Sequence, residues 1–358
     1  MFWIGNKMAS SKNATINDVA AAAGVSRATV SRALAGYGRI SKETVNHVRA
    51  VAEDLGYRPN ALAVAMRAGR TKTIGLVVIS DFTNAFFDRA TKSIIDRAKE
   101  LGYRVLIQHS DEDVSVERVA VETMLANQVD GIILVPASKT QHSHLTPKKL
   151  SGKPLVIIDR KLDVRRFTTV TTGDELAAKE AVLFTAELGH KRMGFLIAVP
   201  GTVGFTSQEP NIPITSVQER IDGFAAGVKA AKASGLWIYS EDKEEVAGSA
   251  VEKMLDSPKA PSVIFTSNND MLLAVLRVVG ERGLAIGKDI SVVSFDDSPW
   301  AAAMVPGITV IARPVEELGA IAVTELIETI EGNAKPKEIV LPARLVRRGS
   351  VARLTKAQ

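Results

Sequence analysis

Apolar residues recur at helical spacing near the N-terminus and form strand-like runs over the rest of the chain. Residues 15–34, TINDVAAAAGVSRATVSRAL, place Val19 and Ala23 four positions apart, a spacing typical of one helix face. Gly24 ends this helix, because glycine adopts a left-handed backbone at little cost. Ser26 then caps a second helix. The pattern predicts two short helices around a tight turn, the helix-turn-helix arrangement.

A third helix is predicted to follow and to end at Gly56. Pro59 disfavours helix in the residue before it, and the segment ALAVAMRAGR after it is helical by propensity but too short to be stable alone. A segment that is helical only when something holds it suits a hinge. The predicted N-terminal parts are a disordered arm (1–14), a DNA-binding headpiece (15–57) and a hinge helix (58–70).

From residue 71 the pattern changes to apolar runs that alternate with amphipathic helical segments. The run IGLVVI at 74–79 has no polar alternation, which is typical of a strand buried on both faces. Repeated strand–helix units predict α/β architecture with parallel sheets, and there are too many units for one sheet. The predicted fold is therefore an all-α headpiece followed by two doubly wound parallel-sheet subdomains, with 339–346 as the last strand.

The body is expected to span residues 71–350. Its N-subdomain is predicted at about 71–170 and 314–338, and its C-subdomain at about 171–312 and 339–350. Ligands of doubly wound sheets bind at the carboxyl ends of the strands. We therefore expect the two subdomains to face each other across a ligand cleft.

Charge is unevenly placed along the chain. The net charge is +5, but residues 1–72 carry 11 Lys and Arg against 4 Asp and Glu, and the remainder carries 34 against 36. A basic head on a near-neutral body indicates a polyanionic partner for the head. The alternative is a solvated basic arm without a partner.

Other classes of protein find little support in the sequence. No apolar run is long enough for a membrane span, and the absence of Cys fits a cytoplasmic protein. His142 and His144 form the only histidine cluster, without a third ligand at metal spacing. No dinucleotide fingerprint or nucleophile elbow is found. We expect no metal, no cofactor and no catalytic residues.

Three segments in this order resemble the lactose-repressor (LacI/GalR) family of transcription regulators. They are TINDVAAAAGVSRATVSRAL, the hinge segment GYRPNALA and VSFDDSPW. The body is similar to periplasmic sugar-binding proteins. The resemblance covers residues 15–350 and implies a homodimer, or a tetramer, that binds a pseudo-palindromic double-stranded DNA operator.

The resemblance also implies the DNA-binding residues. Arg27, Ala28 and Arg32 match base-reading positions of the second helix, although arginines there can contact phosphates alone. In the hinge, Met66 matches an apolar wedge that enters the minor groove, and it can instead serve hinge packing. The full expected set is Thr15, Ser26, Arg27, Ala28, Thr29, Ser31, Arg32, Asn60, Ala63 and Met66.

For the cleft, the resemblance implies an effector site of nine residues. They are Asn84, Phe86, Phe87, Asp159, Arg160, Arg220, Asn269, Asp296 and Trp300. Each has a structural alternative: Asp296 can cap a turn, Arg220 can form a surface ion pair, Asn269 can cap the following helix, and one of the two phenylalanines can be core. The loop at 200–218 is longer than the family leads us to expect, and its role is open.

Together these features predict an effector-controlled DNA-binding repressor. The polar and aromatic cleft residues favour a small neutral polyol, such as ribose or a nucleoside that contains it. Few cations are available for a phosphate. A sugar-binding receptor without a regulatory role and an enzyme are the rival hypotheses.

Overall fold

The computed structural model describes residues 14–35, 38–57, 70–79, 85–199 and 201–354. The chain divides into two compact units, Met1–Thr71 and Lys72–Gln358, and each is described by itself. The predicted arm and hinge lie outside the described residues, except at Ala14 and Arg70. The same holds for Asn60, Ala63 and Met66 of the hinge and for Asn84 of the body.

The first unit contains the three predicted helices, α1 (Ile16–Ala22), α2 (Arg27–Ala35) and α3 (Lys42–Asp54). Thr15 caps α1, and its amide donates to the Asp18 carboxylate at 2.7 Å in a reciprocal capping box. Gly24 lies in the turn with φ of +64°, the left-handed region that favours glycine. Small apolar residues, among them Val19, Val30 and Val48, are buried between the helices.

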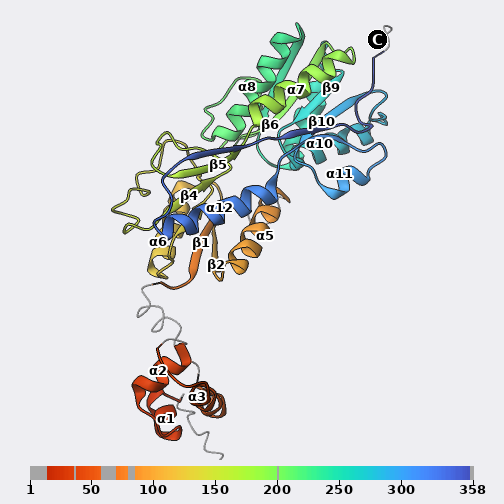
Figure 1. The fold of residues 1–358 in the computed structure, drawn as a ribbon. Coiled ribbons are helices and arrows are strands. Elements are labelled where there is room, and N and C mark those ends of the chain that lie inside the picture. Colours follow the sequence, from red (N-terminus) through yellow and green to blue (C-terminus); the bar gives the residue numbers. More distant parts are fainter. Residues whose placement is uncertain (1–13, 36–37, 58–69, 80–84, 200, 355–358) are drawn as a thin grey trace, which may run out of the picture. The chain divides into compact units, whose positions relative to one another are not determined.

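Six parallel strands form the first sheet of the body, in the order β12-β5-β4-β3-β1-β2. Their bounds are β1 Thr73–Val78, β2 Arg104–His109, β3 Ile132–Leu134, β4 Leu155–Ile158, β5 Thr168–Thr172 and β12 Glu338–Leu341. Helices α5 (Ala85–Glu100) and α12 (Val315–Ile330) cover one face, and α6 (Val114–Ala126) covers the other (Figure 1). Coverage on both faces explains the continuous apolar runs of β1, β3 and β4.

Seven strands form the second sheet, in the order β13-β11-β10-β9-β6-β8-β7. Their bounds are β6 Arg192–Ala198, β7 Phe205–Thr206, β8 Ser234–Ser240, β9 Val263–Thr266, β10 Ser291–Phe295, β11 Thr309–Ala312 and β13 Arg344–Val346. All pairs are parallel except β7 with β8 and β11 with β13.

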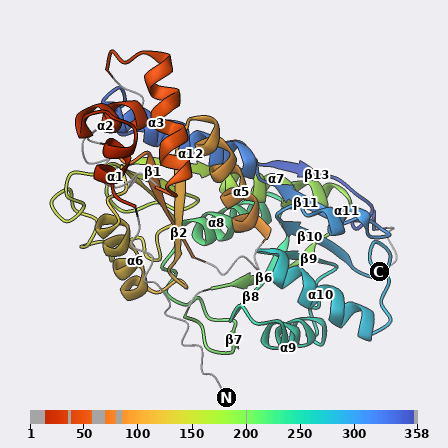
Figure 2. The ribbon, with the colours of Figure 1, turned by 90° about the horizontal axis from the view of Figure 1, so that it is seen from below.

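Four helices cover the second sheet, two on each face. Helices α7 (Asp174–Glu187) and α8 (Thr215–Ala230) share one hydrophobic cluster, and α9 (Glu244–Leu255) and α10 (Asn269–Glu281) share the other (Figure 2). Helices α7 and α8 approach so closely that a Cβ at Gly223 would lie 2.1 Å from the carbonyl oxygen of Glu175. None of the helices in the described ranges combines the length and apolarity that a bilayer crossing requires.

The prediction of one final strand at 339–346 is wrong. Residues Glu338–Leu341 pair with β5 in the first sheet, whereas Arg344–Val346 pair with β11 in the second. Pro342 lies between the two strands, and proline cannot donate a hydrogen bond to a sheet ladder. Residues 339–341 therefore belong to the N-subdomain and not to the predicted C-subdomain. The chain crosses between the sheets three times, after β5, after β11 and after β12.

Candidate functional site

A cavity of about 450 Å³ lies between the two sheets of the body and is lined by residues of both. Asp159 directly follows β4, Asp296 directly follows β10, and Arg313 directly follows β11. The cavity thus lies where the carboxyl ends of parallel strands meet, the usual ligand position in such folds. Its size suits a small organic ligand.

Arg313 connects the two subdomains at the base of this cavity. Its Nε and Nη2 donate to both carboxylate oxygens of Asp296 at 2.7 and 2.9 Å, and its Nη1 donates to Asp159 at 2.7 Å. The guanidinium also lies 3.6 Å from the centre of the Phe86 ring. Burial disfavours the cation, but Asp296, Asp174 and Asp159 outweigh it and raise the pKa of Arg313 above its ordinary value.

Asp296 lines the cavity as predicted for an effector residue, but it does so while it is paired with Arg313. Both of its carboxylate oxygens accept hydrogen bonds from Arg313. The sequence analysis did not single out Arg313. Its place after a buried strand, in the sequence ITVIARP, is the signal that could have revealed it, since polar residues at the carboxyl ends of parallel strands form the site in this fold class.

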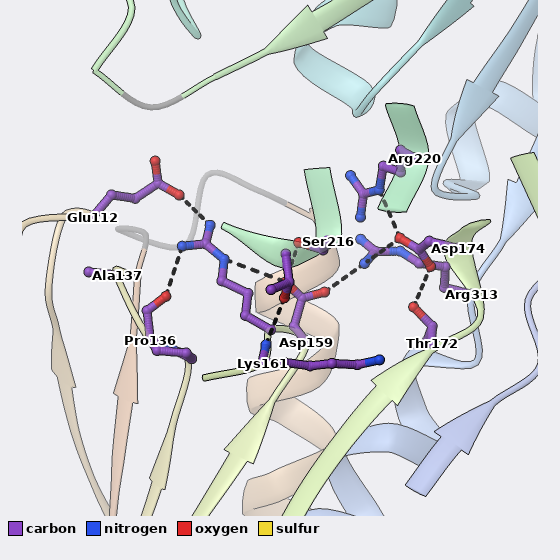
Figure 3. A network of polar contacts seen from close by, with 12 residues as sticks. Glu112, Pro136, Ala137, Asp159, Lys161, Thr172, Asp174, Ser216, Arg220 and Arg313 are labelled. Carbon is purple, nitrogen blue, oxygen red and sulfur yellow. Dashed lines mark hydrogen bonds and ion pairs between the residues drawn. The ribbon is translucent and has the colours of Figure 1, made fainter. Parts of the chain in front are cut away.

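Arg220 forms a second buried contact next to this one. Its Nε donates to Asp174 at 2.8 Å and its Nη1 donates to the carbonyl oxygen of Ser267 at 2.6 Å. Asp174 also accepts a hydrogen bond from the Thr172 hydroxyl and lies 3.8 Å from the Arg313 Nη1 atom. Arg220, Asp174 and Arg313 therefore form one network (Figure 3). Because only 6% of Arg220 is exposed, the alternative of a surface ion pair is wrong.

Arg160 lines the cavity from the N-subdomain. Its Nη1 donates to the carbonyl oxygen of Pro136 at 3.0 Å and its Nη2 pairs with Glu112. Its Nε has no hydrogen-bond partner and lies 3.8 Å from Asp159. Only 4% of Arg160 is exposed, so the Nε atom is closed to solvent and its nearest charge is that of Asp159.

Backbone strain gathers around the same cavity. Four cavity residues other than glycine have positive φ, with values from +49° to +69°: Asp111, Glu112, Asp159 and Asp296. The left-handed region costs a residue with a Cβ roughly 1–2 kcal/mol. Such outliers concentrate at binding sites, where the surrounding structure holds them.

The C-subdomain side of the cavity carries carboxylates. Partial desolvation in the cleft, with the charges of Asp270 and Glu112, raises the pKa of Asp242 to about 7. Desolvation also raises the pKa of Asp270, and the charge of Asp296 adds to this. Seven carboxylate and three guanidinium side chains line the cavity in total, so its electrostatic character is acidic.

The structure brings five of the nine predicted effector residues to the cavity wall: Phe87, Asp159, Arg160, Arg220 and Asp296. Phe86 lies behind Arg313, so the two phenylalanines divide the core and cavity roles. Asn269 is buried and does not line the cavity. Nor does Asn269 cap α10, because the cap is Asn268, whose Oδ1 accepts from the Met271 amide.

Trp300 also lies outside the cavity lining. It is in the short helix α11 (Pro299–Ala303), and 36% of the residue is exposed. Its helix begins with Pro299 and buries Ala301 against the second sheet, which leaves the indole on the solvent side. The residues that sequence reasoning missed include Arg313, Asp242, Asp270 and Ser216.

The long loop before α8 joins both subdomains. Its residues Phe205 and Thr206 form β7 at the edge of the second sheet, and Ile212 is buried in the core beneath α8. The carbonyl oxygen of Pro213 accepts a hydrogen bond from the Lys139 amide of the N-subdomain at 2.9 Å. Ile214 lines the cavity. The loop therefore forms part of the cavity wall.

The second helix of the headpiece presents a different surface. Arg27, Ala28 and Arg32 are exposed on α2, and Arg32 Nε donates to the Ala28 carbonyl oxygen at 3.2 Å. Ser26 accepts from the Thr29 amide at 3.1 Å, which fixes the start of the helix. Thr15 is also exposed and Ser31 is half-buried. This face has the form of a recognition helix.

Comparisons with known proteins agree on one family. Residues 15–60 match the model of bacterial regulatory proteins of the lacI family, and residues 182–351 match the periplasmic binding protein-like domain. Catabolite control protein A of Priestia megaterium is 32% identical over 93% of this chain and 98% of its own length. The regulator DegA of Bacillus subtilis is also 32% identical, over 95% and 98%.

This chain belongs to the LacI family of bacterial regulatory proteins.

Solved structures of the LacI family show the same fold. The lac repressor dimer bound to operator and an anti-inducer has a TM-score of 0.83 at 24% identity, covering 95% of this chain and all of that one. A putative ribose operon repressor from Burkholderia thailandensis has a TM-score of 0.67 at 29% identity, over 77% and 99%. The predicted family and fold class are confirmed. Because LacI-family proteins are transcription regulators, the enzyme hypothesis is set aside.

Proposed function

We propose that this chain is a homodimeric repressor whose operator affinity is controlled by a small-molecule effector in the cleft. One observation carries the proposal: the same chain holds a helix-turn-helix unit and a body in which a network of charged side chains connects two subdomains. Arg313 contacts Asp159 of one subdomain and Asp296 of the other. An effector that binds beside this network favours one arrangement of the subdomains over another, and that difference in affinity is the coupling.

On the DNA side, we propose that α2 reads the operator. Arg27, Ala28 and Arg32 are the base-reading residues, and Thr15, Ser26, Thr29 and Ser31 face phosphates. The exposure of Arg27, Ala28 and Arg32 on α2 supports this assignment. Two such units match a pseudo-palindromic operator, and light scattering distinguishes the dimer from a tetramer. Such a protein acts in the compartment that holds the DNA, the cytoplasm.

For the hinge, we propose that Asn60, Ala63 and Met66 contact the minor groove, with Met66 as the wedge. Met66→Ala should then weaken binding to the specific operator more than binding to unrelated DNA of equal length. Gel shifts with both DNAs at one salt concentration measure the two losses. Equal losses would leave Met66 without a wedge role.

The effector that the cleft supports is a small polyol without phosphate. All three cavity guanidiniums already pair with carboxylates, whereas a phosphate calls for available cations. A solved structure at 29% identity is titled a putative ribose operon repressor, which makes ribose and ribose-containing nucleosides the first candidates.

A gel shift with genomic fragments, followed by titration of ribose, uridine and ribose 5-phosphate, tests this function. We expect binding to a small subset of fragments and a change in that binding with a polyol. Absence of any fragment-specific binding would overturn the repressor proposal. Tight binding of the phosphate ester alone would overturn the choice of effector class.

A further inference from the structure

Cations gather along the edge of the first sheet at which its strands begin. Because the six strands of this sheet are all parallel, the residues that precede them lie along one edge. Five of the six strands have a lysine or arginine at their first residue or within two positions before it. In sheet order these cations are Lys337 at β12, Arg166 at β5, Lys153 at β4, Lys72 at β1 and Arg104 at β2.

Four of these cations pair with no carboxylate among the described residues. Lys337 is the exception, because it pairs with Glu325 of α12. Lys153 and Arg166 line one hollow of about 160 Å³ and therefore lie close together. Lys153 is half-buried and the other three unpaired cations are exposed. We call these four the amino-end row: Arg166, Lys153, Lys72 and Arg104.

Carboxylates do not offset the charge of the amino-end row. Asp130 precedes β3 in the middle of the row, but only 5% of it is exposed, and its Oδ2 accepts a hydrogen bond from the Lys72 amide at 2.8 Å. Glu325 and Glu328 of α12 face Lys337, which lies beyond the row at β12. This edge of the sheet therefore remains positively charged from β5 to β2.

Helix dipoles do not account for the position of these cations. A cation near the carboxyl end of a helix is stabilised by the helix dipole. Helices α6 and α12, which precede β3 and β12, carry no basic residue in their last turn, and the α5 helix already has Arg97 and Lys99 there. The cations of the row follow the starts of the strands instead.

The length of the row suits the backbone of a DNA duplex. Neighbouring strands lie about 4.8 Å apart, so the row from Arg166 on β5 to Arg104 on β2 spans about 20 Å. Phosphates on one strand of a duplex follow each other every 3.4 Å or so along its axis. The row therefore extends over roughly six successive phosphates.

The chain enters the body at this same edge. Lys72 is the first residue of the second unit and directly precedes β1. Residues 58–71 connect it to the headpiece, and a segment of that length spans at most about 50 Å even when fully extended. A headpiece that binds DNA therefore keeps this edge within reach of the same duplex.

We propose that the amino-end row binds the phosphate backbone of the DNA that flanks the operator. Such contacts add affinity and salt dependence, but they read no sequence. The inference rests on the proposed function, since the headpiece has to bring the body to the duplex. It gives the body a contact with DNA in addition to its role in effector binding.

The salt dependence of DNA binding by the full-length protein tests the proposal. The probe is a fluorescent duplex of about 40 base pairs with arbitrary sequence, followed by anisotropy between about 50 and 200 mM KCl. Lys153→Gln combined with Arg166→Gln should flatten the slope of log K against log salt by about 2 for each protomer whose row reaches the duplex, because each phosphate contact contributes about 0.9. The affinity at about 100 mM KCl should fall tenfold or more.

A matched pair of substitutions removes the same charge from the second sheet. Lys229 and Lys288 are exposed and precede β8 and β10. Lys229→Gln combined with Lys288→Gln should leave the slope unchanged, because charges farther from the duplex than a Debye length are screened. A second pair in the row, Lys72→Gln with Arg104→Gln, should flatten the slope as the first pair does, and it carries the test if the half-buried Lys153 proves necessary for folding.

Urea denaturation separates DNA contact from a structural role. We expect the urea midpoint of each folded variant to match that of the unmodified protein. An unchanged slope in both row pairs, or an equal change in the control pair, would overturn the proposal. If specific operator binding and its response to effector persist alongside an unchanged slope, only this inference fails. If the unmodified protein binds neither this duplex nor any genomic fragment, the proposed function fails and the inference fails with it.

Discussion

The second helix of the headpiece and the base of the cleft use arginine in opposite ways. On α2, Arg27 and Arg32 are exposed, and no carboxylate pairs with them in the part of the chain that the structure describes. In the cleft, Arg313 and Arg220 are buried and held by Asp296, Asp159 and Asp174. An arginine without a carboxylate is available to a polyanion, whereas a buried and paired one holds the protein together.

The largest expected effect comes from breaking the buried network. Arg313→Ala strands Asp159 and Asp296 without their counter-charge, so the free energy of unfolding of the body should fall by about 3–5 kcal/mol. Urea denaturation measures this loss. The control Arg277→Ala removes an exposed arginine that pairs with Glu244 and Glu281 and should cost less than about 1 kcal/mol. Similar losses of stability in the two variants would contradict the prediction that the buried Arg313 network stabilises the body more than an exposed ion pair does.

The exposed arginine should show the reverse behaviour. Arg32→Ala is expected to abolish specific operator binding, because a bidentate base contact contributes about 1–3 kcal/mol in each half-site. Unfolding of the protein should be unchanged within about 0.5 kcal/mol, as for other surface substitutions. Gel shifts at fixed salt and urea denaturation give the two numbers. Unchanged operator affinity in the variant would remove Arg32 from the set of base-reading residues.

The same contrast explains what could be predicted from the sequence. The headpiece is a local structure: Thr15, Gly24 and Ser26 fix its caps and turn within twelve residues, and the structure has all three in those roles. Central strands such as β1 and β4 could be predicted equally well, because burial on both faces leaves an uninterrupted apolar run.

The cleft could be predicted only in part, because its contacts join distant segments. Asp159 and Arg313 are hydrogen-bonded although 154 positions separate them. Nothing in the sequence next to Asp296 shows that both of its carboxylate oxygens accept hydrogen bonds from Arg313. Asn268 and Asn269 are equally polar neighbours, and only the start of α10 decides which one is the cap. The change of sheet at Pro342 is likewise set by pairing with distant strands.

The smallest expected effect concerns Asp242, a cavity carboxylate that pairs with no cation among the described residues. The pKa of Asp242 is about 7 in the folded protein and about 3.9 in an unfolded chain. Between these values the folded state binds more protons, so the contribution of Asp242 to stability is present at low pH and is lost as the pH rises toward 7. Asp242→Asn should therefore gain stability relative to the unmodified protein between pH 5 and pH 8, by less than about 1 kcal/mol because this side chain is exposed to solvent.

Asp256→Asn is the matched control for that measurement. Its hydrogen bond from Arg282 lowers the pKa of Asp256 below its ordinary value, so both of its pKa values lie below pH 5 and the stability difference should stay constant from pH 5 to pH 8. Urea denaturation at several pH values compares the two variants with the unmodified protein. A stability difference for Asp242→Asn that also stays constant with pH would mean that Asp242 has an ordinary pKa in the folded protein. A growing gain for Asp242→Asn alone would show that the fold resists ionisation of this carboxylate, in contrast to Asp159 and Asp296, which Arg313 stabilises in the ionised form.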